Sequence, residues 1–245
     1  MLNKYIILAA ISIFAAFAAY IVHFFIFLKY GLSDDPAGWG QFGDYMGGVL
    51  NPLLSFFSLV LLIKSLSLQN EANKDLRDEL KNNEKTEKIK SFNSLFFNMI
   101  NSQKPLLDNL YLCGEAFSEV NEKRGAQAIM QLEDEIDERR GKGANDNELK
   151  EFFTEVDSED QIYGILRAFY ITVKVITDRL SDANGFDSEI RKEHYLTLIN
   201  FTDFSQLRLI IMGMQLTTYP SATYLRDHGE FISVLQETGL KLDPY

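Results

Sequence analysis

The chain has 245 residues, of which 46% are hydrophobic, and a formal net charge of −11 at pH 7. Its first 64 residues contain three lysines and three aspartates, so the whole negative charge belongs to residues 65–245. Nucleic acids and anionic lipids are bound mainly through cationic side chains, so this balance disfavours direct nucleic-acid binding. The single cysteine, Cys113, cannot form an intramolecular disulfide and is interpreted as a small core residue.

The first predicted element is a transmembrane helix over residues 5–28. In these residues His23 is the only potentially charged side chain. A helix of this length extends about 36 Å, which is enough to cross a hydrocarbon core of about 30 Å. A cleaved signal peptide has a shorter apolar region of about 7–15 residues. The segment is therefore interpreted as a retained membrane anchor.

A second transmembrane helix is predicted over residues 45–63, which carry no charge although they include two glycines, Pro52 and several polar residues. Because lipid tolerates no unpaired backbone, this segment should be helical, with any kink at Pro52 buried against protein. The loop between the spans, residues 29–44, contains Trp39 and Phe42, which suit a membrane interface. Lysines and arginines gather after the second span, so the positive-inside rule predicts a periplasmic loop and two cytoplasmic termini.

Polar and small residues repeat along one side of the second predicted span. They follow the three-and-four spacing of a helical face, which defines a polar stripe of Asp44, Gly47, Gly48, Asn51, Ser55 and Ser58. The first span has a seam of small residues, Ala9, Ser12, Ala16 and Ala19, that leads to His23. Counted from the flanking charged residues, His23 and Asn51 should lie at similar depth and are candidate partners.

Two interpretations of the polar stripe stay open. In the first, the stripe holds together the two helices of one hairpin, because small residues permit close approach and polar residues hydrogen-bond across the contact. In the second, several copies assemble with the stripe facing inward and form a polar pathway. Polar side chains at membrane depth are costly enough to make the second interpretation a legitimate functional hypothesis.

The remaining sequence predicts an all-α cytoplasmic region. Residues 65–92 are densely charged and favour a solvated helical stalk, whose apolar stripe from Ile89 to Met99 enters a packed domain of residues 93–245. Pro105 is predicted to open a helix, and residues 141–147 to form an exposed linker. Further helices are predicted over residues 162–180, 204–216 and 222–238, the last stopped by Gly239.

The sequence contains no recognisable catalytic arrangement. Residues 141–143 lack the glycine spacing and the following hydroxyl of a phosphate-binding loop. His194 and His228 have no partner at metal-ligand spacing and are interpreted as surface or core histidines. Pairs such as Glu133 and Asp137 are expected by chance in so acidic a chain. The sequence therefore predicts no enzymatic activity, no metal and no cofactor.

The stretch from Trp39 to Phe56, continuing to Gln69, resembles the phage abortive infection family of AbiC-like membrane proteins. The residues that carry this resemblance are Phe42, Gly43, Asp44, Gly47, Gly48, Leu50, Asn51 and Pro52. The rest of the chain is similar to the family in layout, with two spans followed by an acidic helical domain. Membership would imply bacterial anti-phage defence that damages or arrests the host. Similar two-span proteins act as retron effectors, which would imply a reverse-transcriptase partner that supplies its own basic surface.

These observations favour an effector of the bacterial inner membrane that forms homo-oligomers, contacts the lipid bilayer and perturbs the membrane when a cytoplasmic domain or partner senses infection. One alternative is a membrane-anchored sensor or scaffold that recruits a separate toxic enzyme. A hydrolase within the helical domain is a third interpretation.

Overall fold

The computed structural model describes residues 2–29, 31, 34–112 and 123–245, so Cys113 lies outside the described residues. The chain is 83% helical, which confirms the all-α prediction. It divides into two compact units, Met1–Asn83 and Glu84–Tyr245. The elements in chain order are α1 (Leu2–Ile21), the π-helix η1 (Val22–Phe27), α2 (Pro36–Asp108), β1 (Tyr111–Leu112), β2 (Lys123–Arg124), α3 (Ala126–Gly141), α4 (Asp146–Val156), α5 (Gln161–Arg179), the 3-10 helix η2 (Asp182–Asn184), α6 (Ser188–Phe201), α7 (Phe204–Leu216), α8 (Pro220–Asp227) and α9 (Gly229–Glu237).

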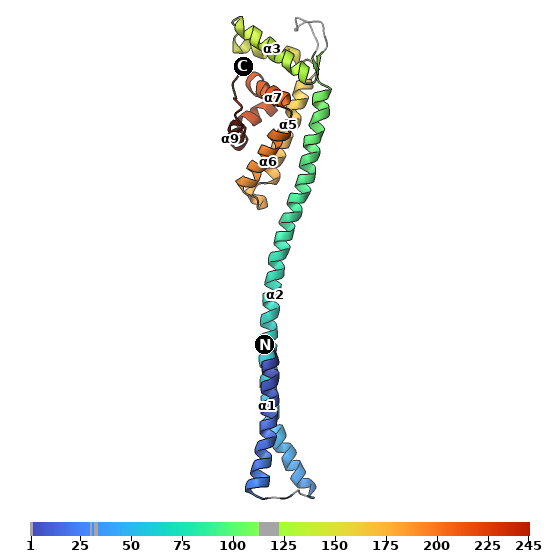
Figure 1. Cartoon of the computed structure of the whole chain (residues 1–245), viewed down its shortest axis with the longest axis vertical. Helices are drawn as coiled ribbons and strands as arrows, with labels where there is room; N and C mark the ends of the chain where they lie inside the picture. Colours follow the sequence, from blue (N-terminus) through green and yellow to red (C-terminus); the bar gives the residue numbers. More distant parts are fainter. Residues whose placement is uncertain (1, 30, 32–33, 113–122) are drawn as a thin grey trace. The chain divides into compact units, whose positions relative to one another are not determined.

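The first unit pairs α1 with the beginning of α2. Figure 1 shows α1 lying along α2, with the two helices parting toward η1. Both are long and apolar enough to cross a membrane. In the most apolar 18-residue stretch of each helix, only 6% and 11% of the residues are buried. The core helix of a soluble protein would be mostly buried, so the low values fit contact with lipid. At the η1 end, Tyr20 packs its ring on Phe42 and Tyr45, with centroids 4.6 and 5.3 Å apart.

Helix α2 starts earlier than predicted and runs further. It begins at Pro36, not at residue 45, because the Asp35 carboxylate accepts a hydrogen bond from Ala37 N–H at 3.0 Å and proline suits the first helical position. Much of the predicted loop is therefore helical. Pro105 does not open a new helix but lies within the last turn of α2, which ends at Asp108. Residues 65–88 are helical and exposed, as the charge pattern predicts.

The second unit has one core, built around α5 and α7. The predicted stripe of α5 is fully buried, including Leu166, Phe169 and Val173, and α7 matches its predicted range of 204–216. Figure 1 shows α5 and α6 beside the C-terminal part of α2, which contributes Phe92 and Phe96 to this core. The unit begins at Glu84, ahead of the predicted border at residue 93. Phe92, which precedes that border, is already buried in the core.

Three local predictions in this unit need correction. The predicted helix 222–238 is two helices, α8 and α9, which part at His228 because its backbone is extended there and its side chain caps α9. The predicted linker 141–147 shrinks to four residues between α3 and α4, since Asn145 and Glu148 form a capping box that starts α4. A two-stranded antiparallel pair, β1 with β2, joins α2 to α3, whereas no strand was predicted.

Candidate functional site

The polar stripe lies on the side of α2 that faces away from α1. Its members Asp44, Gly48, Asn51, Ser55 and Ser58 are exposed, and Gly47 is half-buried. The positions of α2 that are buried on α1 are a separate, apolar set that includes Met46 and Phe57. Successive residues of an α-helix turn by about 100°, so the two sets occupy opposite sides of the helix.

The two spans are joined by apolar and small side chains. Ala16 of the predicted seam is buried, while Ala9 and Ser12 are half-buried and Ala19 is exposed. The Ser12 hydroxyl donates to the carbonyl of Leu8 at 2.9 Å, within its own helix. The interpretation in which the stripe holds one hairpin together is therefore wrong, because packing of α1 on α2 uses the other side of α2.

The proposed pairing of His23 with Asn51 is also wrong. The contacts of Tyr20 with Phe42 and Tyr45 fix the register of the two antiparallel helices. In that register Asn51 lies level with Ser12, about three helical turns from His23 along the axis. Both His23 and Asn51 are exposed, and the His23 ring packs edge-on against Phe24.

Pro52 adds a backbone group to the polar stripe. Proline has no N–H and cannot donate the helical hydrogen bond to the carbonyl four residues earlier, which belongs to Gly48. Pro52 itself is exposed, so the expectation that it packs against protein does not hold within one chain. The outer side of α2 thus presents a carbonyl, an amide, two hydroxyls and a carboxylate.

Asp157, the most buried carboxylate among the described residues of the second unit, has a structural role. Asp157 is 4% exposed and accepts hydrogen bonds from Ile162 N–H at 2.7 Å, Tyr163 N–H at 2.9 Å and the Tyr219 hydroxyl at 2.8 Å. Burial raises the pKa of Asp157, and these hydrogen bonds oppose that rise. Since its oxygens are engaged by the first turn of α5 and by Tyr219, Asp157 positions α5 and is not poised for chemistry.

The two histidines of this unit each bridge helices. His194 packs edge-on against the rings of Phe92 and Phe96, and its Nε2 is 3.0 Å from Oδ1 of Asn93, which ties α6 to α2. His228 joins α9 to α5 through Thr177, at 2.9 Å. Within the residues that the structure describes, no three His, Cys, Asp or Glu side chains are placed to hold a metal ion.

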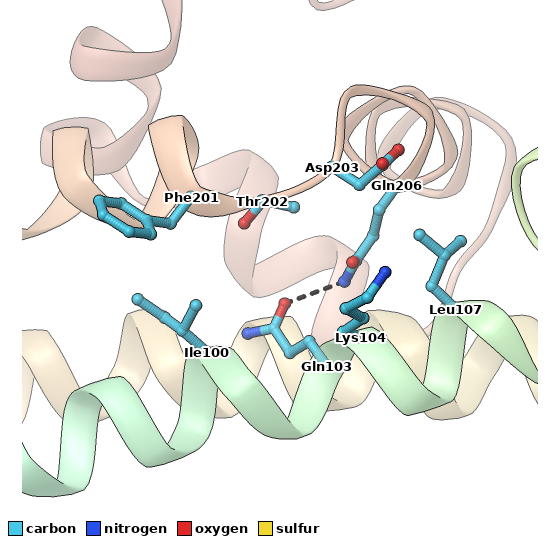
Figure 2. A pocket seen from close by; sticks show the side chains of 8 residues that line it. All are labelled: Ile100, Gln103, Lys104, Leu107, Phe201, Thr202, Asp203 and Gln206. Carbon is cyan, nitrogen blue, oxygen red and sulfur yellow. Dashed lines mark hydrogen bonds between the residues drawn. The ribbon is translucent and has the colours of Figure 1, made fainter.

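A small cavity between α2, α6 and α7 was not anticipated from the sequence. It has a volume of about 240 Å³ and is shown in Figure 2. Its floor is a pair of buried amides, in which Gln206 Nε2 donates to Gln103 Oε1 at 2.9 Å and Gln103 Nε2 donates to Thr172 at 3.1 Å. Its lining residues are Ile100, Gln103, Lys104, Leu107, Phe201, Thr202, Asp203 and Gln206.

No protein-family model, curated protein or solved structure matches this chain.

Proposed function

We propose that this protein is a membrane-embedded effector of anti-phage abortive infection, which assembles into homo-oligomers through the polar stripe of α2 and perturbs the bacterial inner membrane. Sensing of infection belongs to the acidic helical unit or to a partner that it binds, such as a retron reverse-transcriptase complex. The excess of lysine and arginine after the second span supports cytoplasmic termini and a periplasmic loop.

The observation that carries this proposal is the outward position of the polar stripe. The Asp44, Asn51 and Ser55 side chains are exposed on the single chain, on a helix whose flanks are apolar. Lipid cannot hydrogen-bond the Asn51 amide or the Ser55 hydroxyl, so exposure of these groups at membrane depth is costly, while Asp44 lies just before the predicted span. Contact with the stripes of neighbouring copies removes this cost and gathers the polar groups in the middle of the assembly.

The stripe can be tested by measuring membrane potential during infection with a voltage-sensitive dye. Asn51→Leu and Ser55→Leu each replace a polar group with an apolar one. An interhelical hydrogen bond in a membrane averages only about 0.6 kcal/mol, so expression and membrane insertion should be retained. An apolar ring at a narrow polar pathway blocks conduction by dewetting, so both variants should lose depolarisation and protection.

Phe56→Leu is the matched control. Phe56 is 61% exposed on the same turns of α2 but lies outside the stripe, and the change keeps an apolar side chain facing lipid. We expect depolarisation at the unaltered level. Full depolarisation by both well-expressed stripe variants would refute the pathway. Growth arrest with unchanged potential in the unaltered protein would instead favour a scaffold that recruits a toxic enzyme.

A further inference from the structure

The cavity between α2, α6 and α7 contains an unused hydrogen-bond acceptor. Gln206 is 2% exposed, and its Nε2 is engaged by Gln103. Its Oε1 forms no hydrogen bond with any group in the described part of the chain, and in Figure 2 the Gln206 amide extends into the cavity. This oxygen is not sealed in the core, so it can accept a hydrogen bond from an occupant of the cavity that carries N–H groups.

The size of the cavity favours one side chain over a small-molecule ligand. Sites for cofactors and drug-sized ligands measure about 300–1,000 Å³, whereas this cavity measures about 240 Å³. A single long side chain fills a space of this order. Its lining residues come from α2, α6, α7 and the turn between α6 and α7, so a segment seated in the cavity would contact all three helices.

Two aromatic rings extend the apolar surface beyond the cavity. Phe201 lines it and is 66% exposed, and Phe97 of α2 is 43% exposed with its ring centroid 6.1 Å from that of Phe201. Exposed aromatic rings beside a pocket are typical of the places where protein interfaces gain most of their binding energy. Such a surface fits an apolar segment better than a metabolite.

The negative charge of the second unit favours a cationic hydrogen-bond donor in the cavity. Residues 1–83 carry a net charge of −1 out of −11, so residues 84–245 carry −10, which draws cationic partners. Asp203 contributes to the cavity lining, and its Oδ1 accepts a hydrogen bond from Ser205 N–H at 2.8 Å as the cap of α7. The one basic residue in the lining, Lys104, has its Nζ 3.5 Å from the Asp108 carboxylate, so its charge is partly compensated. An arginine or lysine is therefore preferred over an acidic side chain.

We infer that this cavity is the docking site for a basic, apolar segment of a partner protein, whose arginine or lysine donates to Gln206 Oε1 while neighbouring apolar residues pack on Phe97 and Phe201. This inference rests on the proposed function in naming the kind of partner that the acidic unit senses. The site itself needs no membrane perturbation, so its binding can be measured separately.

The probe is the peptide acetyl-Ala-Leu-Arg-Leu-Ala-amide, titrated by calorimetry into the full chain in lipid nanodiscs. A peptide with glutamate in place of arginine should bind about tenfold more weakly or not at all, because its side chain offers no donor and is repelled by the acidic unit. Phe201→Ala should weaken binding of the arginine peptide by about fivefold or more. Because Phe201 is exposed, this change should leave thermal unfolding unaltered.

The matched control is Phe204→Ala. Phe204 is 61% exposed but packs over Arg208, 5.4 Å from the guanidinium, and is not among the lining residues, so affinity should stay within about twofold. Equal affinity for the two peptides, or equal affinity of the Phe201→Ala and Phe204→Ala variants, would overturn the inference. Free arginine binding as tightly as the peptide would overturn the assignment to a protein segment.

The two proposals can fail independently. Loss of peptide binding in Phe201→Ala without any infection-linked depolarisation in the unaltered protein would support the docking site and refute the membrane function. Depolarisation that depends on Asn51, together with no binding of the arginine peptide, would support the membrane function and refute the docking site.

Discussion

At the scale of single residues, His228 combines a helix cap with a link between helices. Its Nδ1 accepts a hydrogen bond from Phe231 N–H at 3.2 Å, and its Nε2 lies 2.9 Å from Thr177 Oγ1. Thr177 already donates its only hydroxyl proton to the carbonyl of Val173, at 3.0 Å, so it must accept from His228. The neutral imidazole with its proton on Nε2 is the one form that satisfies both contacts.

The charge state of His228 therefore couples pH to the stability of α9. Burial lowers the pKa of His228, against weaker opposing effects that include the nearby Glu230 carboxylate. The unfolded chain binds this proton more readily than the folded chain does. The stabilisation is thus complete above the unfolded pKa, about 6.5, and is lost as pH falls through the folded pKa.

We expect the full chain in detergent to become less stable between pH 7.5 and pH 5.5, measured by thermal unfolding. Protonation of Nδ1 removes the cap, and such caps contribute about 1 kcal/mol. His228→Asn keeps a capping oxygen but does not titrate, so its loss over this pH range should be smaller. An identical pH dependence in both proteins would show that His228 does not control this transition.

At the scale of elements, the approach of α7 to α5 depends on a glycine. A Cβ added at Gly213 would lie 2.6 Å from Cδ1 and 3.2 Å from Cγ of Leu166. Leu166 is fully buried in the core, so its side chain has no free space to move into. Gly164, in the first turn of α5, has no atom within 4 Å of the same added Cβ.

Replacing each of these two glycines by alanine should have opposite effects on the stability of the helical unit. Gly213→Ala should destabilise the helical unit by about 1–3 kcal/mol, the usual cost of overpacking a core. Gly164→Ala should stabilise it by about 0.5–1 kcal/mol, because alanine loses less conformational entropy in a helix. Both changes in stability can be measured by chemical denaturation of the full chain in detergent, with helix content followed by far-UV circular dichroism. Two changes of the same sign would contradict this account of the α5–α7 contact.

At the scale of the whole molecule, the proposed topology depends on the order of apolar and basic segments. A reporter enzyme that is active only in the periplasm should work when inserted after Gly31 and stay silent when fused after Tyr245. Insertion at Gly31 precedes the Asp35 cap, so α2 can still form. The reverse pattern of activity would refute cytoplasmic termini, and with them the placement of the acidic unit.

Hydrophobic periodicity in the sequence was sufficient to predict the helical fold and the positions of α5 and α7. An unbroken pattern such as that of Ile162, Leu166 and Phe169 specifies a buried helical face without knowledge of its partner. Helix ends were harder to predict, since the break at His228 rests on a histidine cap, and histidine is not among the residues that usually cap helices. The early start of α2 could have been predicted from the sequence, because Asp35 and Pro36 form a recognisable N-terminal cap.

Helical spacing in the sequence is enough to place Asp44, Asn51 and Ser55 on one face of a helix and to identify two apolar spans. The packing of distant segments was needed to show that this face turns away from α1, and that Gln206 and Phe201 line a cavity with Gln103 of α2. The physical reason is that helical spacing specifies which side chains share a side of a helix. What that side meets depends on packing between segments far apart in the chain, which no local pattern encodes.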